Sequence, residues 1–433
     1  MEKVNEIDGE GKTSSLHKKT LGKYSIGIGD RFGLEAGAQL RAILQARNAG
    51  VLVTPVWNKS YREHQIIGSI PEITRQRADE AVAELSWKFP YFVDADHITF
   101  STVELFINCC DFFTLDVANF IGKQATHEQI HEFIEANEKY VGEISLPGVA
   151  GKIFVNEKLL EKIAEKYLGA VTEAGRIYRF IAEASDDRSF VVEISLDEAE
   201  TAQRPVELLF ILSAIAREKI PLNTIAPRFS GRFNKGIDYS GNPAQFARGF
   251  ELDLAVIEFA KGNFTVPPDL KLSVHSGSDK FSLYPFIRES MRKFDAGIHL
   301  KTAGTTWLAE LAGLAESGQE GLRIAKEIYG RSLREFADLC APYSRVINID
   351  QRSLPTRKEV NSWTGRQFAA ALDHNQENEH FNSNFRQLLH VAYKIAADLG
   401  GEYIAAIQNN REIISRKVTE NLFERHIKPL FLF

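Results

Sequence analysis

Histidines and acidic residues follow several short apolar segments of this sequence. Asp96-His97 comes after FVDA, His275 directly follows KLSV, His299 stands inside GIHLK, and Glu193 stands inside FVVEIS. Imidazole nitrogens together with a carboxylate suit a divalent ion such as Zn, Mn, Co or Ni. A single histidine is more often an ordinary core or surface residue, but several at the ends of separate segments favour one shared ion. The predicted ligands are His97, Glu193, His275 and His299.

Eight apolar segments could position these residues as strands of one sheet. Continuous apolar runs that alternate with longer helical patterns are typical of strands buried on both faces of a parallel sheet. Eight such strands predict an α/β fold, a closed (β/α)8 TIM barrel, with its active site at the carboxyl ends of the strands. The predicted strands are YSIGIGDRF from Tyr24, VLVTPVW from Val51, YFVDADHITF from Tyr91, DFFTLDV from Asp111, SFVVEIS from Ser189, NTIAPRF from Asn223, KLSVHSG from Lys271 and AGIHLKTAG from Ala296.

The spacing of the segments predicts how the chain is divided. Residues 1–304 are expected to form the catalytic barrel with a helical insertion over about 123–187, and residues 305–433 a helical extension packed on the barrel. The link between the third and fourth predicted strands is short for a crossover helix. Strand ends also affect the ligand set, because Glu198 or Glu200 would replace Glu193 if the fifth strand ended later.

Composition excludes several classes of function. The formal net charge is −6, so no basic excess is present to neutralise nucleic-acid phosphates. No apolar run approaches the roughly 20 residues that span a bilayer, and residues 1–23 are polar and charged, unlike a signal peptide. We therefore expect a cytoplasmic protein without nucleic-acid or membrane partners, as a monomer or a homo-oligomer. Of its 3 cysteines, Cys109 and Cys110 are adjacent, which predicts neither a disulfide framework nor a zinc site.

Two further motifs indicate ordinary structure. Gly27, Gly29 and Gly33 form G-x-G-x-x-x-G, one residue longer than the dinucleotide fingerprint, and the next predicted strand ends without the expected acidic residue. We interpret the motif as a tight turn. His127 and His131 belong to an H-E-x-x-H sequence, which in metalloproteases binds zinc. Both lie at the border of an apolar stripe, which favours a half-exposed helix.

Longer strings resemble known enzymes. The pair Asp96-His97 and the string H-S-G-S-D from His275 resemble the class II, metal-dependent ketose bisphosphate aldolases. LSVHSGSDKFSLYPF, GIHLKTAGTTWLAEL and ENLFERHIKPLF are similar to the tagaturonate epimerase family, and the similarity covers most of the chain. The resemblance implies an isomerase of hexuronate catabolism. Its sugar-acid substrates, D-tagaturonate and D-fructuronate, differ only at C4.

The implied reaction constrains the mechanism. The C4 proton is not α to the C2 ketone, so direct deprotonation gives no stabilised carbanion. Oxidation at C4 by a nicotinamide or retro-aldol cleavage between C3 and C4 remains. We favour cleavage and expect no nicotinamide; a divalent ion would supply Lewis acidity and a carboxylate would accept the C4 hydroxyl proton. Asp96, beside a predicted ligand, is the predicted acid/base, and Asp279, with Tyr284 in reserve, is predicted to serve the opposite face.

Basic residues near strand ends could bind the substrate carboxylate. Arginine pairs with a carboxylate through a planar fork and lysine as a point charge. Small residues after His275 could add backbone N–H groups, and residues 231–239 could form a lid over the site. The predicted substrate-binding residues are Arg31, Arg228, Ser276, Gly277, Ser278, Lys280 and Lys301.

Two other functions are compatible with these motifs. A class II aldolase that releases its fragments would share every motif, and product analysis distinguishes it from an epimerase. A barrel that acts as a non-catalytic subunit of an aldolase complex would show no turnover as a purified chain.

Overall fold

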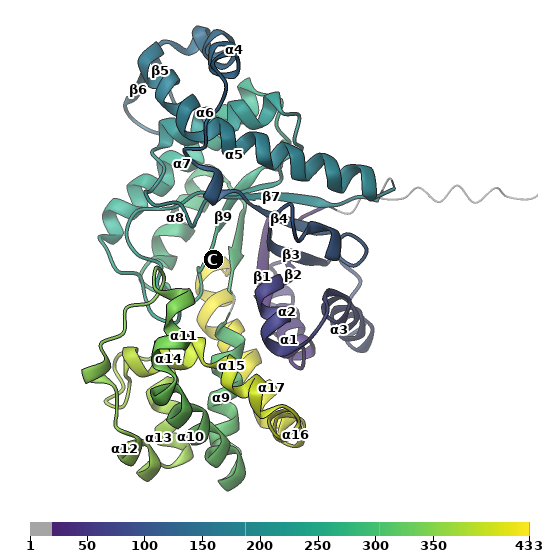
Figure 1. Cartoon of the computed structure of the whole chain (residues 1–433), viewed down its shortest axis with the longest axis vertical. Coiled ribbons are helices and arrows are strands. Elements are labelled where there is room, and N and C mark those ends of the chain that lie inside the picture. Colours follow the sequence, from purple (N-terminus) through teal and green to yellow (C-terminus); the bar gives the residue numbers. More distant parts are fainter. Residues whose placement is uncertain (1–19, 187, 303, 433) are drawn as a thin grey trace, which may run out of the picture.

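Eight parallel strands form a closed barrel in the computed structural model, which describes residues 20–432 except 187 and 303 (Figure 1). The strands pair in chain order, and the last pairs with the first. All eight predicted strands, and with them the (β/α)8 fold, are confirmed. They are β1 (Tyr24–Gly29), β2 (Val53–Ser60), β3 (Phe92–Ile98), β4 (Phe112–Asp116), β7 (Val191–Ser195), β8 (Thr224–Ala226), β9 (Lys271–Val274) and β10 (Ile298–Lys301).

Helices between the strands cover the outside of the barrel. The link between β3 and β4 contains only a short 3-10 turn, η1 (Val103–Leu105), which accounts for the short spacing in the sequence. None of the described helices is long and apolar enough to cross a membrane, and the prediction about residues 1–23 concerns mostly positions outside the described range. The helices are α1 (Ala36–Asn48), α2 (Tyr61–Ile67), α3 (Pro71–Glu84), η2 (Ala118–Phe120), α5 (Glu157–Ala184), α6 (Pro205–Arg217), α7 (Pro243–Asn263) and α8 (Tyr284–Phe294).

The region between β4 and β7 contains more than helices. It begins with α4 (His127–Asn137) and η3 (Glu138–Tyr140) and continues with an antiparallel hairpin of β5 (Gly142–Ser145) and β6 (Lys152–Val155). The hairpin lies at the end of the molecule opposite the C-terminal helices (Figure 1). Its strands are short and partly polar, so their sequence does not show the apolar run that identifies a barrel strand.

The barrel interior is layered, because every second residue of a strand points inward. A small apolar cluster fills one end and consists of Leu21, Val56, Phe92, Phe112 and Val191. Residues two positions further along β3 and β7, Asp94 and Glu193, are fully buried and polar. The inward face thus changes from apolar to charged toward the carboxyl ends of the strands.

The C-terminal extension has its own core, built around buried aromatic residues such as Trp307, Tyr329 and Phe385. In Figure 1 its helices lie together on one side of the barrel. They are α9 (Thr305–Glu316), α10 (Gln319–Arg334), α11 (Phe336–Cys340), η4 (Ala341–Tyr343), η5 (Gln351–Ser353), α12 (Arg357–Ser362), α13 (Gly365–Leu372), α14 (Ser383–Val391), α15 (Tyr393–Leu399), α16 (Gly401–Asn409), α17 (Arg411–Glu420), the π-helix η6 (Asn421–Ile427) and α18 (Lys428–Phe431).

The end of the chain returns to the barrel. The π-helix η6 packs on α1, and α18 packs on α8. Ile427, Leu430 and Phe431 belong to the same buried cluster as the barrel strands, and the Phe431 ring lies 5.2 Å from that of Tyr24. These last residues therefore contact the barrel's first and last covering helices, whereas the sequence division places them in the extension.

A buried glutamate at the start of α1 joins the barrel to α17. Ser415 donates a 2.7 Å hydrogen bond to one oxygen of Glu35, and the other oxygen has no partner in the described structure. Burial raises the Glu35 pKa from 4.5 to about 7, and Asp30 adds to the effect. A carboxyl group whose pKa is higher in the folded state contributes its full stabilisation when the pH is below its pKa in the unfolded chain. This stabilisation is lost as pH rises from 4.5 to about 7.

We expect Glu35→Gln to relieve this pH dependence. The wild type should lose up to about 3 kcal/mol of stability across this range through Glu35 alone. The difference in Tm, variant minus wild type, should therefore increase by a few °C between pH 5 and pH 8. Calorimetric scans at each pH measure it. Any cost of placing the amide is the same at every pH, so Tm profiles that remain parallel would contradict the assignment.

Candidate active site

A cavity of about 1040 Å³ opens at the carboxyl ends of the barrel strands. This is where active sites of (β/α)8 barrels lie. Side chains at or just beyond the carboxyl ends of β1, β3, β7 and β9 line it, among them Arg31, His97 and His275. The extension contributes part of the wall through residues 342–347 and Tyr393. The barrel and the extension together thus enclose this space.

Two histidines and an aspartate come together in this cavity. His97, Asp197 and His275 each offer one ligand atom, and these atoms all lie within 4.8 Å of one another. His97 Nε2 is 3.4 Å from Asp197 Oδ1, and His275 Nδ1 is 3.3 Å from Asp197 Oδ2. Each histidine thus lies near a different oxygen of Asp197. The donor types, two imidazole nitrogens and a carboxylate, suit a transition-metal ion such as zinc.

The second nitrogen of each histidine bonds to another carboxylate. His97 Nδ1 donates to Asp96 at 2.8 Å, and His275 Nε2 donates to Glu193 at 2.7 Å. Metal-ligating histidines usually donate their other N–H to a carboxylate, which fixes the tautomer and the ring orientation. Each histidine therefore presents its remaining nitrogen toward Asp197.

Local backbone geometry directs both Asp96 and His97 into the cavity. Strict alternation along β3 would turn one of them outward. The pairing of β3 with β4 shifts register between Ala95 and Ile98, and His97 adopts a φ of 52°. A bulge of this kind re-aims a side chain and is common beside active sites. The strand irregularity is thus the reason that neighbouring residues share one site.

A buried lysine neutralises the acidic layer below the histidines. Lys301 Nζ donates to Asp94 at 2.8 Å and to Asp96 at 2.7 Å, and it lies 3.1 Å from Glu193. Burial acts to raise the pKa of Glu193, but Lys301 and then His275 hold that pKa well below its usual range. The pKa of Asp94 is raised to about 7, chiefly by burial. Lys301 therefore supports Asp96 and Glu193 rather than offering a free cation.

His299 lies in the barrel interior and is not part of the three-residue cluster. Its Nδ1 is 2.9 Å from Ser25 Oγ, and its Nε2 has no partner in the described structure. Burial lowers its pKa to about 3, so the ring is neutral. Gly27 faces the same space, since a Cβ on it would lie 3.4 Å from His299 Nε2 and 2.9 Å from the Lys301 side chain. The first glycine of G-x-G-x-x-x-G thus makes room for these residues.

Asp279 and Tyr284 lie outside the cavity lining. Asp279 is fully buried, accepts a 2.8 Å bond from Arg386 and is 3.3 Å from His374 Nδ1. The Tyr284 hydroxyl donates to the Gly277 carbonyl at 2.7 Å. Both residues connect the loop after β9 to its surroundings, and their role as proton acceptors stays a prediction.

The predicted substrate-binding residues are placed differently from one another. Arg31, Arg228 and Ser276 line the cavity, with Lys301 at its floor, whereas Gly277, Ser278 and Lys280 do not. Arg31 forms an ion pair with Glu63 and lies 4.5 Å from the centre of the Tyr393 ring. Arg228 donates to the Ala199 carbonyl at 2.5 Å. Arg31 and Arg228 therefore already have protein partners.

Asp197 is the residue that sequence reasoning missed. The sequence offered Glu193, Glu198 and Glu200 as carboxylate ligands, but Glu193 lies inside β7 and orients His275. Residues 193, 195 and 197 share the inward face of β7 and its continuation, so Asp197 extends that face one step above Glu193. Counting every second residue beyond the strand end would have identified it.

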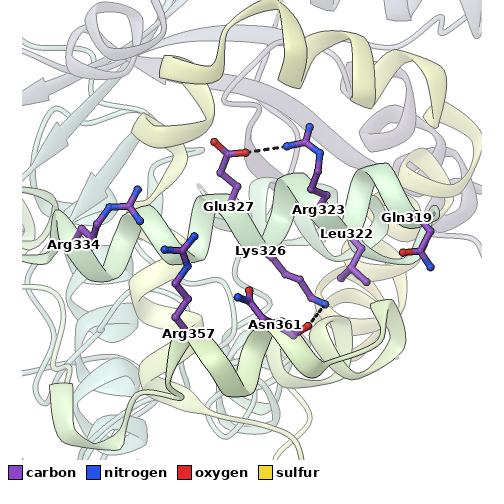
Figure 2. Close-up of a pocket in the computed structure, with 8 residues that line it drawn as sticks. All are labelled: Gln319, Leu322, Arg323, Lys326, Glu327, Arg334, Arg357 and Asn361. Carbon is purple, nitrogen blue, oxygen red and sulfur yellow. Dashed lines mark hydrogen bonds and ion pairs between the residues drawn. The ribbon is translucent and has the colours of Figure 1, made fainter.

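The H-E-x-x-H segment forms an ordinary surface helix. Thr126 and Gln129 make a capping box at the start of α4, and His127 and His131 are exposed. A second hollow, of about 440 Å³, lies along α10 and faces α12 in the C-terminal extension (Figure 2). Its charged side chains are largely satisfied, as in the Arg323–Glu327 ion pair and the bond from Lys326 to the Asn361 carbonyl. Neither feature offers a site comparable to the barrel cavity.

A closed barrel whose mouth gathers histidines, carboxylates and a buried lysine defines a (β/α)8-barrel enzyme with a candidate metal centre. The model of the tagaturonate epimerase family (UxaE) matches residues 13–430. The chain therefore belongs to the tagaturonate epimerase family and is an isomerase.

Similar proteins are known in sequence and in structure. The chain is 27% identical over 425 residues to the tagaturonate/fructuronate epimerase of Thermotoga maritima, an alignment that covers 94% of this chain and 81% of the relative. The fold is similar to crystal structures of the fructuronate-tagaturonate epimerase of Cohnella laeviribosi. The complex with two glycerol molecules gives a TM-score of 0.78 at 23% identity, and the alignment covers 96% of this chain and 83% of that one. The native structure gives 0.77, with 94% and 81% covered.

Proposed function

We propose that this enzyme interconverts D-tagaturonate and D-fructuronate by metal-dependent retro-aldol cleavage and re-addition. The observation that carries the proposal is the cluster of His97, Asp197 and His275 in the barrel cavity, with Asp96 bonded to His97. The names of the relatives supply the substrates. The C4 position of these substrates, which lacks an acidic proton, supplies the reason for breaking a carbon–carbon bond.

His97, Asp197 and His275 would hold the divalent ion. When bound, such an ion supplies Lewis acidity for the substrate's C2 carbonyl and C3 oxygen. Asp96 and Glu193 hold the histidine rings from behind, and Lys301 keeps both carboxylates ionised within the barrel. The protein therefore fixes the donors before substrate binds, which is the requirement for a pre-organised site.

Two carboxylates of the cavity can exchange protons with the C4 oxygen. Asp96 lines the cavity and would accept the C4 hydroxyl proton as the C3–C4 bond breaks. After the aldehyde turns, its oxygen points to another side and needs a second partner. Asp116, at the end of β4, also lines the cavity, and burial raises its pKa. We assign this second role to Asp116.

Metal removal tests the proposal. Purified protein incubated with D-tagaturonate should form D-fructuronate, as followed by carbon NMR. Dialysis against a chelator should abolish the conversion, and Zn, Mn, Co or Ni should restore it. Unchanged epimerisation in a metal-free sample would reject the metal, and accumulation of three-carbon products without fructuronate would identify an aldolase. No turnover at any metal concentration would favour a non-catalytic barrel.

A further inference from the structure

The loop between β8 and α7 lines the cavity, and hydrogen bonds to its backbone hold it in place. Lys280 Nζ donates to the carbonyls of Asn234 at 2.9 Å and Ile237 at 2.7 Å, and Arg386 Nε donates to the Gly236 carbonyl at 2.5 Å. These contacts come from the barrel loop after β9 and from α14 of the extension. Lys280, predicted to bind substrate, thus acts on the backbone of this loop instead.

Lys235 lies within this hydrogen-bonded segment, residues 234–237. Its backbone N–H donates to the Val346 carbonyl at 2.8 Å, and its side chain lines the cavity. Its Nζ makes no hydrogen bond or ion pair with the part of the chain that the structure describes. Burial, and then Arg31, lower its pKa, whereas Glu198, Asp197 and Asp96 act to raise it. Lys235 is therefore a partly buried cation close to the site carboxylates.

Other cations of the cavity are engaged or exposed. Lys301 contacts three carboxylates, Arg31 pairs with Glu63, and Arg228 bonds to a carbonyl. The remaining basic residues at the rim, which are exposed to solvent, are Arg62, Arg232 and Arg345. An exposed ion pair contributes little because water and salt screen it. Lys235 combines partial burial with a free ammonium group.

We propose that Lys235 binds the substrate carboxylate and holds the aldehyde fragment while its reacting carbon turns over. This inference rests on the proposed retro-aldol function. It assigns a specificity-determining role to a residue of the β8–α7 loop. The hydrogen bonds to the backbone of this loop position the Lys235 side chain.

The chemistry explains why an anchor is needed at the carboxylate. Breaking the C3–C4 bond leaves its electron pair on C3, as the enediolate of dihydroxyacetone, and converts C4 to the aldehyde of tartronate semialdehyde, while the C4 hydroxyl proton passes to Asp96. Rotation about the C4–C5 bond presents the other face of the aldehyde. The C3–C4 bond then forms again, the C4 oxygen takes a proton from Asp116, and proton exchange with solvent returns Asp96 and Asp116 to their starting states. No oxidant is consumed, and the carboxylate at C6 can remain on Lys235 throughout.

Lys235→Met removes the charge and keeps most of the side-chain length. A charge-assisted bond is worth roughly 1.5–3 kcal/mol, so kcat/KM for tagaturonate should decrease by about 10- to 150-fold. For tagatose, which has no carboxylate, kcat/KM should change by less than about threefold. Lys235→Arg should restore part of the preference for tagaturonate. Lys358→Met, at an exposed position of α12, is the matched control and should leave both values unchanged.

A second readout follows the released fragment. In Lys235→Met the fraction of turnovers that release tartronate semialdehyde, trapped by a reductase, should increase severalfold over the wild type. Equal loss on tagaturonate and tagatose, or an unchanged preference with unchanged release, would overturn the inference. Loss of preference in Arg232→Met instead would transfer the role to the rim. A wild type that does not epimerise tagaturonate would refute the proposed function itself, which is a separate result.

Discussion

Replacing Asp197 with Ala is expected to remove the bound metal and to lower the epimerase rate by about three orders of magnitude or more. Asp197 is the residue toward which both His97 and His275 present their free nitrogens. Lewis-acid stabilisation contributes several kcal/mol, and each 1.4 kcal/mol corresponds to a tenfold change in rate. Metal content by mass spectrometry and kcat by NMR measure the two effects on the same sample.

Glu200→Ala and Glu193→Gln are the informative comparisons for Asp197. Glu200 is exposed in the same loop, and its variant should keep both metal and activity. Glu193→Gln should weaken metal binding by only about 10- to 100-fold, as expected for a group that orients a ligand. Full metal occupancy in Asp197→Ala, together with a metal-free Glu193→Gln, would return the ligand role to Glu193.

Asp96→Asn is expected to lower kcat by about 10²- to 10⁴-fold while most of the metal is retained. The amide oxygen can still accept the hydrogen bond from His97 Nδ1, which is 2.8 Å long in the wild type. The amide can no longer take up a proton. The variant therefore separates the acid/base role of Asp96 from its support of His97.

The same assay distinguishes the two roles of Asp96 and tests Asp116. If Asp96→Asn lost activity only in proportion to lost metal, and excess metal restored the rate, Asp96 would be a positioning residue alone. Asp116→Asn should keep the metal and lose activity in both directions of the reaction, since each direction uses both proton carriers. A fully active Asp116→Asn would reopen the assignment of the second acceptor.

The barrel could be predicted because its strands are buried on both faces. Such strands appear as continuous apolar runs, and all eight were identified from them. The hairpin of β5 and β6 was missed because its strands are short and half-exposed. The packing of Phe431 on Tyr24 depends on contacts between the two ends of the described chain, which no local pattern shows.

The site could be predicted only in part. Its residues are determined by which side chains of each strand point inward and by contacts between residues far apart in the sequence. His97 and His275 were predicted as ligands from their positions at strand ends, and the structure places them in one cluster. Glu193 and His299 share the inward face of their strands but lie deeper, and Asp197 lies one step higher. Residues 231–239 were predicted as a lid, but no substrate role was predicted for Lys235, because its position depends on contacts with Lys280 and the extension.

Substrate labelled with deuterium at C4 tests the retro-aldol account most directly. Carbon–carbon cleavage never breaks the C4–H bond, so fructuronate formed from C4-deuterated tagaturonate should keep all its deuterium, show no large primary isotope effect and be accompanied by traces of trapped tartronate semialdehyde. A large primary isotope effect together with stoichiometric bound nicotinamide, or exchange of the C4 deuterium with solvent, would contradict it.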